Sequence, residues 1–326
     1  AKKARAVVKK NPGASLVDLD DGVLTLEFHS KINPIGGDTI EMLVAGVAEA
    51  ERNFEALVVG NESPAFSVGA NLMLVLFEAQ EGNWDEIDLM VRSFQSAVLG
   101  LRYADVPVVV APAGLTLGGG CEVVLHGDGV QAAAETYMGQ VEVGVGLIPA
   151  GGGTKELLVR SINRRQSTID DSLPFVRQVF ELIGIGKVST SALDAKHLGL
   201  LGPADRITMN RDRLLADAKN LALGLSDAGY QPPQAPMISV GGDSVRAGLE
   251  LGVHIAWRGE HISDHDALIG RKLARILSGG DLPHPTSVSE QYLLDLEREA
   301  FLSLCGEPRT LERIAHTLKT GKTLRN

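Results

Sequence analysis

The sequence predicts an α/β core followed by a helical C-terminal region, and three observations lead to this fold class. Short apolar runs, typical of strands buried on both faces, alternate with amphipathic helical patterns up to about residue 160. Each buried run ends in a turn that contains glycine. After about Ser161 the strand pattern stops and helical periodicity continues. Such alternation is typical of a parallel sheet built from strand–helix–strand units.

The expected elements of the core follow one another at short intervals. An alternating, β-rich strand is expected at residues 22–30, an amphipathic helix at 38–52, a buried strand at 56–60, a helix at 87–103 and a second buried strand at 106–112. In open α/β sheets ligands bind at the carboxyl ends of the strands. The turns after the two buried strands are therefore the first places to look for a site.

The rest of the chain is expected to be helical, with clear breaks. Helices are expected at residues 211–226, 247–277 and 288–304, a Pro-rich boundary lies at 230–236, and the loop GGDLPHP separates the last two helices. We therefore divide the sequence into a basic lead-in at residues 1–21, a core at 22–204 and a helical C-terminal region at 205–326.

Composition excludes several classes of protein. The chain has 326 residues, 44% of them hydrophobic and 22% charged, which fits a globular protein. Its net charge of −10 argues against nucleic acid as the main partner. Two cysteines give no disulfide framework, so we expect a reducing, cytoplasmic location. No membrane span is expected, because proline and glycine interrupt the apolar stretch at 106–121. No signal peptide or starting Met is present, so the chain is expected to be processed or cut from a longer protein.

Two glycine-rich segments, each with one well-placed acid, carry the functional prediction. Glu122 follows GGGC, and Glu142 lies 20 residues later before a second glycine-rich stretch, PAGGG. A carboxyl group among Gly, Val and Leu must be paired or have a perturbed pKa. The GGG turn before an expected helix would aim backbone N–H groups at a developing oxyanion, although a purely structural turn is an equal alternative. These features favour acid/base chemistry beside an anion-stabilising loop.

Together these motifs resemble the enoyl-CoA hydratase/isomerase, or crotonase, superfamily over about residues 15–225. AFSVGANL is similar to the first oxyanion loop of that family, with Ala70 at its donor position, and GGGCE is similar to the second, with Gly119. Glu122 and Glu142 fall on the two catalytic acids of the hydratases. The resemblance implies a crotonase-like spiral of ββα turns, usually assembled as trimers or as hexamers made of two trimers.

The resemblance also implies the roles of neighbouring residues. Ser67, Val68 and Leu72 would contact the coenzyme A part of the substrate. Ala150 stands where hydratases commonly have glycine, at a position whose N–H helps to hold the reacting water. The long C-terminal part is similar to bacterial 3-hydroxyacyl-CoA dehydrogenases fused to a hydratase, so the partner is expected to be either fused dehydrogenase domains or copies of the same chain.

The implied activity is hydration of a 2-enoyl-CoA to a 3-hydroxyacyl-CoA in fatty-acid β-oxidation. The alternatives are Δ3-Δ2 enoyl-CoA isomerisation, which needs essentially one base, and a non-catalytic acyl-CoA-binding or assembly role. No cofactor is expected in this chain beyond the CoA thioester as substrate. The pattern GxGxxG fails after Gly118 and Gly120, so NAD is expected only if dehydrogenase domains are fused upstream. An α/β hydrolase is disfavoured because GxSxG is missing.

Two further groups have a simpler interpretation than a functional one. His261 and His265 are spaced like metal ligands, but no third ligand is placed as known motifs require, so we expect a solvated helix face and no metal. Cys121 has no base nearby in the sequence, and we expect a buried apolar side chain rather than a nucleophile.

Overall fold

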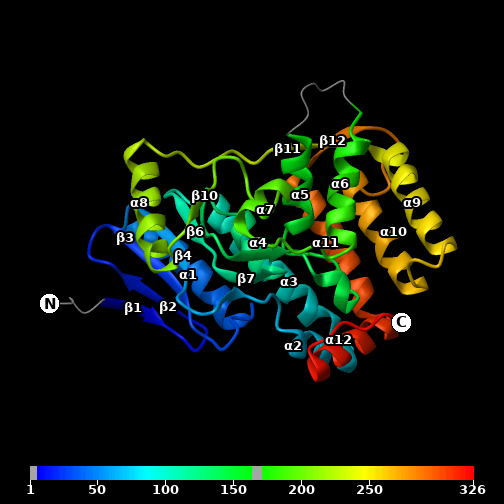
Figure 1. Cartoon of the computed structure of the whole chain (residues 1–326), viewed down its shortest axis with the longest axis horizontal. Helices are drawn as coiled ribbons and strands as arrows, with labels where there is room; N and C mark the ends of the chain where they lie inside the picture. Colours follow the sequence, from blue (N-terminus) through cyan, green and yellow to red (C-terminus); the bar gives the residue numbers. More distant parts are fainter. Residues whose placement is uncertain (1–5, 164–170) are drawn as a thin grey trace. The chain divides into compact units, whose positions relative to one another are not determined.

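The computed structural model describes residues 6–163 and 171–326 (Figure 1). Contacts between its elements divide the chain into two units, and each unit is described by itself. Unit 1 contains residues up to 71, then 93–139 and 188–234. Unit 2 contains residues 72–92, 140–187 and 235–326.

Among the described residues, unit 1 holds a seven-stranded sheet and a three-stranded sheet. The larger sheet has the order β1 (Ala6–Lys10), β2 (Ala14–Asp18), β3 (Val23–Phe28), β4 (Ala56–Gly60), β6 (Val108–Ala111), β8 (Gly129–Ala133) and β10 (Arg206–Thr208). Its first three strands are antiparallel neighbours, and pairing is parallel from β3 onward. The smaller sheet is parallel and contains β5 (Ala65–Ser67), β7 (Gly114–Leu117) and β9 (Thr136–Gly139).

The order of these strands along the chain confirms the predicted repetition of ββα turns. A strand of the larger sheet is followed each time by a strand of the smaller sheet: β4 by β5, β6 by β7, and β8 by β9. Helices then follow, namely α2 (Leu72–Glu81) and α3 (Trp84–Arg102) after the first pair and α4 (Gly119–Leu125) after the second. Each of β5 and β7 is therefore followed by a helix that begins within about five residues of the end of the strand.

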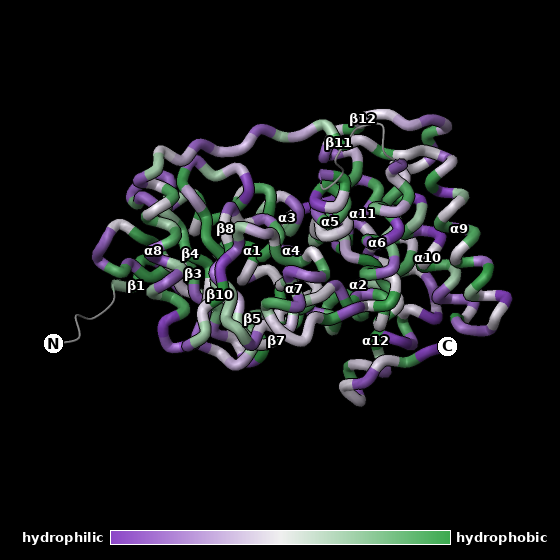
Figure 2. The backbone as a smooth tube through the Cα atoms, turned by 45° about the horizontal axis from the view of Figure 1, so that its top comes forward, coloured by the Kyte–Doolittle hydropathy of each residue, from purple (hydrophilic) through white to green (hydrophobic). Residues whose placement is uncertain are grey.

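Two helices of unit 1 cover opposite faces of the larger sheet. On α1 (Gly37–Asn53), a Cβ added at Gly46 would meet the side chains of Leu26 and Leu57. On α8 (Leu214–Asp227), buried Leu and Ala residues pack in a cluster with Val58. Leu57 and Val58 are adjacent in β4, so they point to opposite faces. Because both faces are covered, the central strands are continuous apolar runs (Figure 2).

Unit 2 is mainly helical in its described residues. Its remaining elements are η1 (Glu142–Val145), α5 (Gly153–Ile162), α6 (Leu173–Gly184), β11 (Met237–Val240), α9 (Gly242–Arg258), α10 (Asp264–Ser278), β12 (Thr286–Ser289), α11 (Glu290–Cys305) and α12 (Pro308–Thr320). The shorter elements α7 (Ala192–Leu198) and η2 (Arg211–Arg213) belong to unit 1. β11 and β12 form an antiparallel pair that the sequence patterns did not reveal.

The single helix expected at residues 247–277 was wrong, because two helices occupy that range. α9 ends at Arg258, and Glu260 then takes a left-handed backbone with a φ of 58°. Ser263 begins α10 by accepting the amide of Asp266, whose carboxylate accepts the Ser263 amide in return. The apolar periodicity continues across this break, and the capping pair rather than the periodicity decides where the second helix begins.

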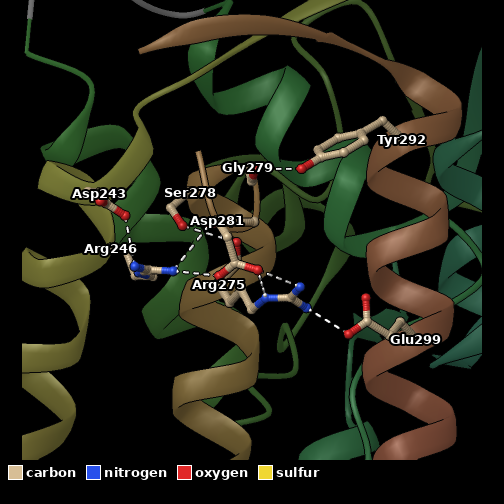
Figure 3. A network of polar contacts seen from close by, with 9 residues as sticks. Asp243, Arg246, Arg275, Ser278, Gly279, Asp281, Tyr292 and Glu299 are labelled. Atoms are coloured by element: carbon tan, nitrogen blue, oxygen red, sulfur yellow. Dashed lines mark hydrogen bonds and ion pairs between the residues drawn. The ribbon is translucent and has the colours of Figure 1, made fainter. Parts of the chain in front are cut away.

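The loop GGDLPHP between α10 and β12 is fixed by ion pairs around Asp281 (Figure 3). Arg275 contacts the Asp281 carboxylate at 2.8 Å, and Arg246 contacts its other oxygen at the same distance. Hydrogen bonding from Arg275 lowers the pKa of Asp281. Tyr292 donates its hydroxyl to the carbonyl of Gly279 at 3.1 Å. The loop is therefore connected to α9, α10 and α11 by side chains.

Two further predictions concern the N-terminal segment and membrane-spanning helices. The part of the basic lead-in that the structure describes forms β1 and β2, while residues 1–5 lie outside the described residues. Among the helices that the structure describes, none is both long and apolar enough to cross a membrane.

A buried acid in unit 1 gives the fold a testable pH dependence. Asp128 accepts the amide of Val108 at the start of β6 at 2.8 Å. Burial raises its pKa to about 6 from an ordinary 3.8, against the lowering effect of that hydrogen bond and of one from Tyr230. A raised pKa in the folded state means that the protonated form is favoured. Its contribution to stability is therefore present below about pH 4 and lost as the pH rises through 6.

We predict that Asp128→Asn removes this dependence. The free energy of unfolding of the wild type, relative to the variant, should fall by about 2–3 kcal/mol between pH 4 and pH 7. Urea unfolding of the wild type and of Asp128→Asn at four pH values measures this difference in the free energy of unfolding. Asp227→Asn, an exposed change on α8, serves as the control and should keep the wild-type pH profile. A constant difference between wild type and Asp128→Asn would contradict the prediction.

Candidate active site

The loop after β5 brings its backbone directly against the start of α4, within unit 1. Gly69 has a φ of 94°, and a Cβ placed there would lie 3.3 Å from the amide nitrogen of Gly119 and 3.1 Å from the carbonyl oxygen of Leu117. The hydroxyl of Ser67 accepts the Gly69 amide at 3.2 Å. Both the left-handed φ and these close contacts favour glycine at this position. The first predicted oxyanion loop and the second are therefore neighbours in this unit.

The amide of Ala70 is directed away from its bridge partner. Ile35 donates to Gly69 at 2.8 Å and accepts from Asn71 at 3.1 Å, which makes a parallel bridge between Ile35 and Ala70. In such a bridge the enclosed residue, here Ala70, directs its own N–H to the other side. Across the described residues, no backbone acceptor receives the amide of Ala70.

Gly119 presents the second amide of this arrangement. Gly118 has a φ of 52°, and α4 begins at the next residue. The first N–H groups of a helix have no acceptor within the helix, and that of Gly119 meets no backbone acceptor in the part of the chain that the structure describes. A Cβ at Gly120 would lie 2.6 Å from that of Ser67, so α4 starts as close to β5 as glycine allows.

Glu122 lies in the first turn of α4 and is buried, with 3% of its surface exposed. Its amide donates to Gly118 at 3.0 Å, and its carbonyl accepts from Nδ1 of the buried His126 at 2.7 Å. Nδ1 of His126 therefore carries the proton. An acidic side chain in the first helical turn is stabilised by the positive end of the helix dipole. Unit 1 thus combines one backbone donor in the loop after β5 with a second donor and a buried acid in the first turn of α4.

Glu142 begins the 3-10 helix η1 in unit 2 and is partly exposed. The buried side-chain amide of Gln140, with its nitrogen toward Glu142, donates to the two carboxylate oxygens at 3.2 and 3.3 Å. These contacts fix the direction in which the carboxylate points. Gln140 is not among the site residues predicted from the sequence, although a polar residue two positions before an acid in a charge-poor stretch is a signal that could have indicated it.

The PAGGG loop that contains Ala150 is held by a carboxylate from α11. Glu297 is completely buried and accepts the amide of Gly152 at 2.8 Å and that of Lys155 at 2.6 Å. It therefore caps the N-terminus of α5 from a position 142 residues later in the chain. Ala150 is buried just before this capped turn. No pattern in the sequence points to Glu297, because such a cap depends on the packing of distant helices.

A buried lysine completes the attachment of α5 to α11. Lys155 is fully buried, and its Nζ lies 2.6 Å from the carboxylates of both Glu156 and Glu290. Removing one member of such a buried group leaves an uncompensated charge, which is strongly destabilising. The loop before α5 is therefore set in place by charged groups that water does not reach.

The remaining predicted site residues are placed as follows. Ser67 is buried under α4, Val68 donates to Ile32 at 3.3 Å, and Leu72 is the first residue of α2 in unit 2. Their contact with coenzyme A stays a prediction. Unit 1 brings Ala70, Gly119 and Glu122 together, and unit 2 holds Glu142 and Ala150.

The structure contradicts the prediction for His265 and confirms the prediction for Cys121. A solvated face for His265 was wrong: it is 2% exposed, and Nε2 lies 2.9 Å from the hydroxyl of Thr310. His261 lies before α10 in an exposed turn, so the two histidines do not share a helix. Across the described residues no group of three or more His, Cys, Asp or Glu could hold a metal ion. The prediction of a buried Cys121 is confirmed.

The chain is similar to one protein family and to several named proteins. Residues 19–168 match the family model described as Enoyl-CoA hydratase/isomerase. A protein of Bacillus subtilis (strain 168) named "Probable 3-hydroxyacyl-CoA dehydrogenase" is 46% identical over 325 residues, which make up 100% of this chain and 41% of that protein. The chain spans about two-fifths of the length of the curated relatives that it matches over most of its own length.

Solved structures share the fold. An enoyl-CoA hydratase from Bacillus halodurans superimposes with a TM-score of 0.63 at 16% identity, over 93% of this chain and 99% of that one. An enoyl-CoA hydratase from Bacillus anthracis gives a TM-score of 0.55 at 21% identity, over 80% of this chain and 89% of that one. At these identities the likeness concerns the fold alone.

We predict that Gly69→Ala separates the two backbone segments. The left-handed φ and the short contacts together should lower the free energy of unfolding by about 2–3 kcal/mol. Gly82→Ala is the matched control, since Gly82 also has a positive φ, of 73°, but its added Cβ meets nothing within 4 Å. Chemical unfolding of both variants measures the difference. Equal losses would show that backbone conformation alone, without close approach, requires Gly69.

We also predict that Glu297→Gln destabilises the chain. Gln offers one acceptor oxygen in place of two and directs an NH2 group at a helix N-terminus, so the loss should be about 2–4 kcal/mol. Glu299→Gln is the control on the same helix, because its exposed pair with Arg275 should be worth less than about 1 kcal/mol. Thermal and urea unfolding measure both. Similar small effects of the two changes would contradict the capping role.

Proposed function

Because the chain belongs to the enoyl-CoA hydratase/isomerase superfamily, we propose that it adds water to the double bond of a 2-enoyl-CoA to give a 3-hydroxyacyl-CoA. The observation that carries this proposal is the pair of Ala70 and Gly119 amides beside the buried Glu122 in unit 1. Backbone donors on two neighbouring segments suit a thioester oxygen that gains negative charge, and a carboxyl group in the first turn of α4 would supply acid/base chemistry.

In the proposed reaction, attack of water at Cβ sends electrons toward the thioester carbonyl, so that its oxygen takes on enolate character. The N–H groups of Ala70 and Gly119 would donate to that oxygen. Each such preorganised donor is worth about 3–4 kcal/mol in comparable sites. Because both amides belong to fixed backbone, they need no rearrangement as the charge develops. Transition-state stabilisation would therefore come mainly from the close approach of the two loops.

The resemblance assigns the proton transfers to the two acids. We propose Glu122 as the base that accepts a proton from the attacking water and Glu142 as the acid that donates a proton to Cα. Gln140 supports the second role, because its contacts with both oxygens of Glu142 fix the carboxyl group in one orientation. The N–H of the Ala150 loop would help to hold the water, with Glu297 keeping that loop in place.

Hydration is favoured over Δ3-Δ2 isomerisation because isomerisation needs essentially one base, whereas this chain has an acid at both family positions. A non-catalytic acyl-CoA-binding role would require neither acid. The matched relative named as a dehydrogenase supports the proposal that this chain acts as a module of a longer protein. In that case the 3-hydroxyacyl-CoA product would pass to an NAD-dependent dehydrogenase within fatty-acid β-oxidation, and this chain itself would need no cofactor.

We predict that Glu142→Gln lowers the rate of crotonyl-CoA hydration by at least about 100-fold, because the amide cannot donate the required proton, with little change in binding of the CoA ester. Glu122→Gln should have a comparable effect. Loss of absorbance of the enoyl thioester measures the rate, and calorimetry measures binding. Glu181→Gln, in an exposed ion pair on α6, is the control and should keep wild-type activity.

Three outcomes would count against this proposal in different ways. Full activity of Glu142→Gln would overturn the assigned acid. Conversion of a 3-enoyl-CoA but not of a 2-enoyl-CoA would favour the isomerase. Binding of crotonyl-CoA by the wild type without any loss of absorbance would favour a non-catalytic role.

A further inference from the structure

The turn that carries Glu142 is attached to α12 by one buried hydroxyl group within unit 2. Thr310 is fully buried, and its Oγ1 donates to the carbonyl oxygen of Gly146 at 2.9 Å. Gly146 is the residue that ends η1, four positions after Glu142. The hydrogen bond thus joins the C-terminal end of the turn to a helix more than 160 residues later in the chain.

His265 on α10 fixes the direction of that hydroxyl. Nε2 of His265 lies 2.9 Å from Oγ1 of Thr310. A hydroxyl has one proton, and here that proton is used toward Gly146, so Nε2–H of His265 must donate to Thr310. Burial, together with the charge of Arg313, lowers the pKa of His265, which agrees with a neutral ring that keeps one N–H for this bond. The order of donation is therefore His265 to Thr310 to the carbonyl of Gly146.

The turn and α12 leave no space for a side chain at Gly146. Gly146 has a φ of 84°, and a Cβ there would lie 2.8 Å from Oγ1 and 2.9 Å from Cα of Thr310. The turn is closed by its own backbone, since Leu147 donates to the carbonyl of Glu142 at 3.0 Å. Movement of the Gly146 carbonyl is thereby passed directly to the backbone of Glu142.

A second side chain of α12 holds the same turn near its start. Arg313 is 1% exposed, and its Nη1 donates to the carbonyl of Val143 at 3.2 Å. The same guanidinium pairs with Asp266 of α10 at 2.8 Å and donates to Asn326 at 2.8 Å. Both ends of η1 therefore contact a side chain of α12, and each of these two side chains also contacts a side chain of α10.

We propose that Thr310 is a positioning residue for Glu142, acting through the carbonyl of Gly146. The proposal rests on the catalytic role proposed above for Glu142. Thr310 itself touches neither substrate nor reacting atoms. Its hydroxyl keeps the turn in the one arrangement in which Glu142 and its partner Gln140 face the substrate. By this inference the C-terminal helices α10 and α12 help to position the proposed acid and are not merely an appended region.

The test compares two substitutions of the full 326-residue chain. Thr310→Val keeps the shape of the side chain and removes the hydroxyl, whereas Thr310→Ser keeps the hydroxyl and removes a methyl group. We expect Thr310→Val to lower kcat for crotonyl-CoA hydration by roughly 10- to 100-fold with KM within about twofold, because a misplaced catalytic group lowers the rate of the chemical step more than it weakens binding. Thr310→Ser should retain kcat within about threefold.

A second readout is independent of activity. Amide hydrogen exchange should accelerate by about tenfold or more at residues 142–147 in Thr310→Val but not in Thr310→Ser, because the turn loses its hydrogen bond to α12. His265→Leu and His265→Gln form a second pair. Leu removes the donor and should behave like Thr310→Val, while the amide nitrogen of Gln can replace Nε2 and should behave like Thr310→Ser. This pair decides the question if Thr310→Val does not fold.

Each outcome has a definite meaning. Wild-type kcat and exchange in Thr310→Val, or equal losses in Thr310→Val and Thr310→Ser, would overturn the proposal, since the hydroxyl would then have no special role. A wild-type chain that hydrates no 2-enoyl-CoA would overturn the proposed function instead. In that case hydrogen exchange at residues 142–147 still decides whether Thr310 fixes the turn.

Discussion

The close approach of two backbone segments is the constraint on which unit 1 depends. The loop after β5 and the first turn of α4 meet at Gly69, Gly119 and Gly120, with the side chain of Ser67 buried between them. Strands β5 and β7 pair in parallel, which brings their ends to the same side of the small sheet. The larger sheet, covered by α1 and α8, supplies the rigid support that keeps those ends in register. The two amides of the proposed oxyanion hole exist as a pair only because of this packing.

In unit 2 the important contacts are those that hold irregular backbone in place. Side chains from later helices contact the backbone of both its PAGGG loop and its η1 turn. Glu297 caps α5, and Thr310 and Arg313 hold η1. Burying charges such as Lys155 is costly unless they are paired, so these contacts favour one arrangement over others even where they add little net stability.

These two features would allow one chain to combine a stable fold with the proposed acid/base chemistry. Backbone donors that glycine places are rigid and carry no charge, which suits an oxygen that becomes negative only during the reaction. Carboxylates need a fixed direction, and in unit 2 a neighbouring amide, Gln140, together with the helices behind the turn, provides it for Glu142. Long-range contacts in the second half of the chain are thus as important for the proposed chemistry as the motifs in the first half.

Elements that repeat a simple pattern could be predicted from the sequence. The buried strand at residues 56–60 agrees with β4 at both ends, and the helix expected at 38–52 agrees with α1 to within one residue at each end, because apolar side chains recur with the periods of strand and helix. The glycine motifs and the two acids were also legible, since glycine is selected by local backbone conformation and a lone acid stands out in an apolar stretch. These features depend on neighbours in the chain.

Features that depend on contacts between residues far apart in the chain could not be predicted in this way. The break between α9 and α10 follows from a capping pair that continued apolar periodicity conceals. β11 and β12 are strands because they pair with each other across more than 45 residues. His265 had the spacing of a metal ligand or a solvated face, yet it is buried against Thr310. The contacts of Glu297 with the amides of Gly152 and Lys155, and of Arg313 with the carbonyl of Val143, join residues more than 140 positions apart, so no local pattern predicts them.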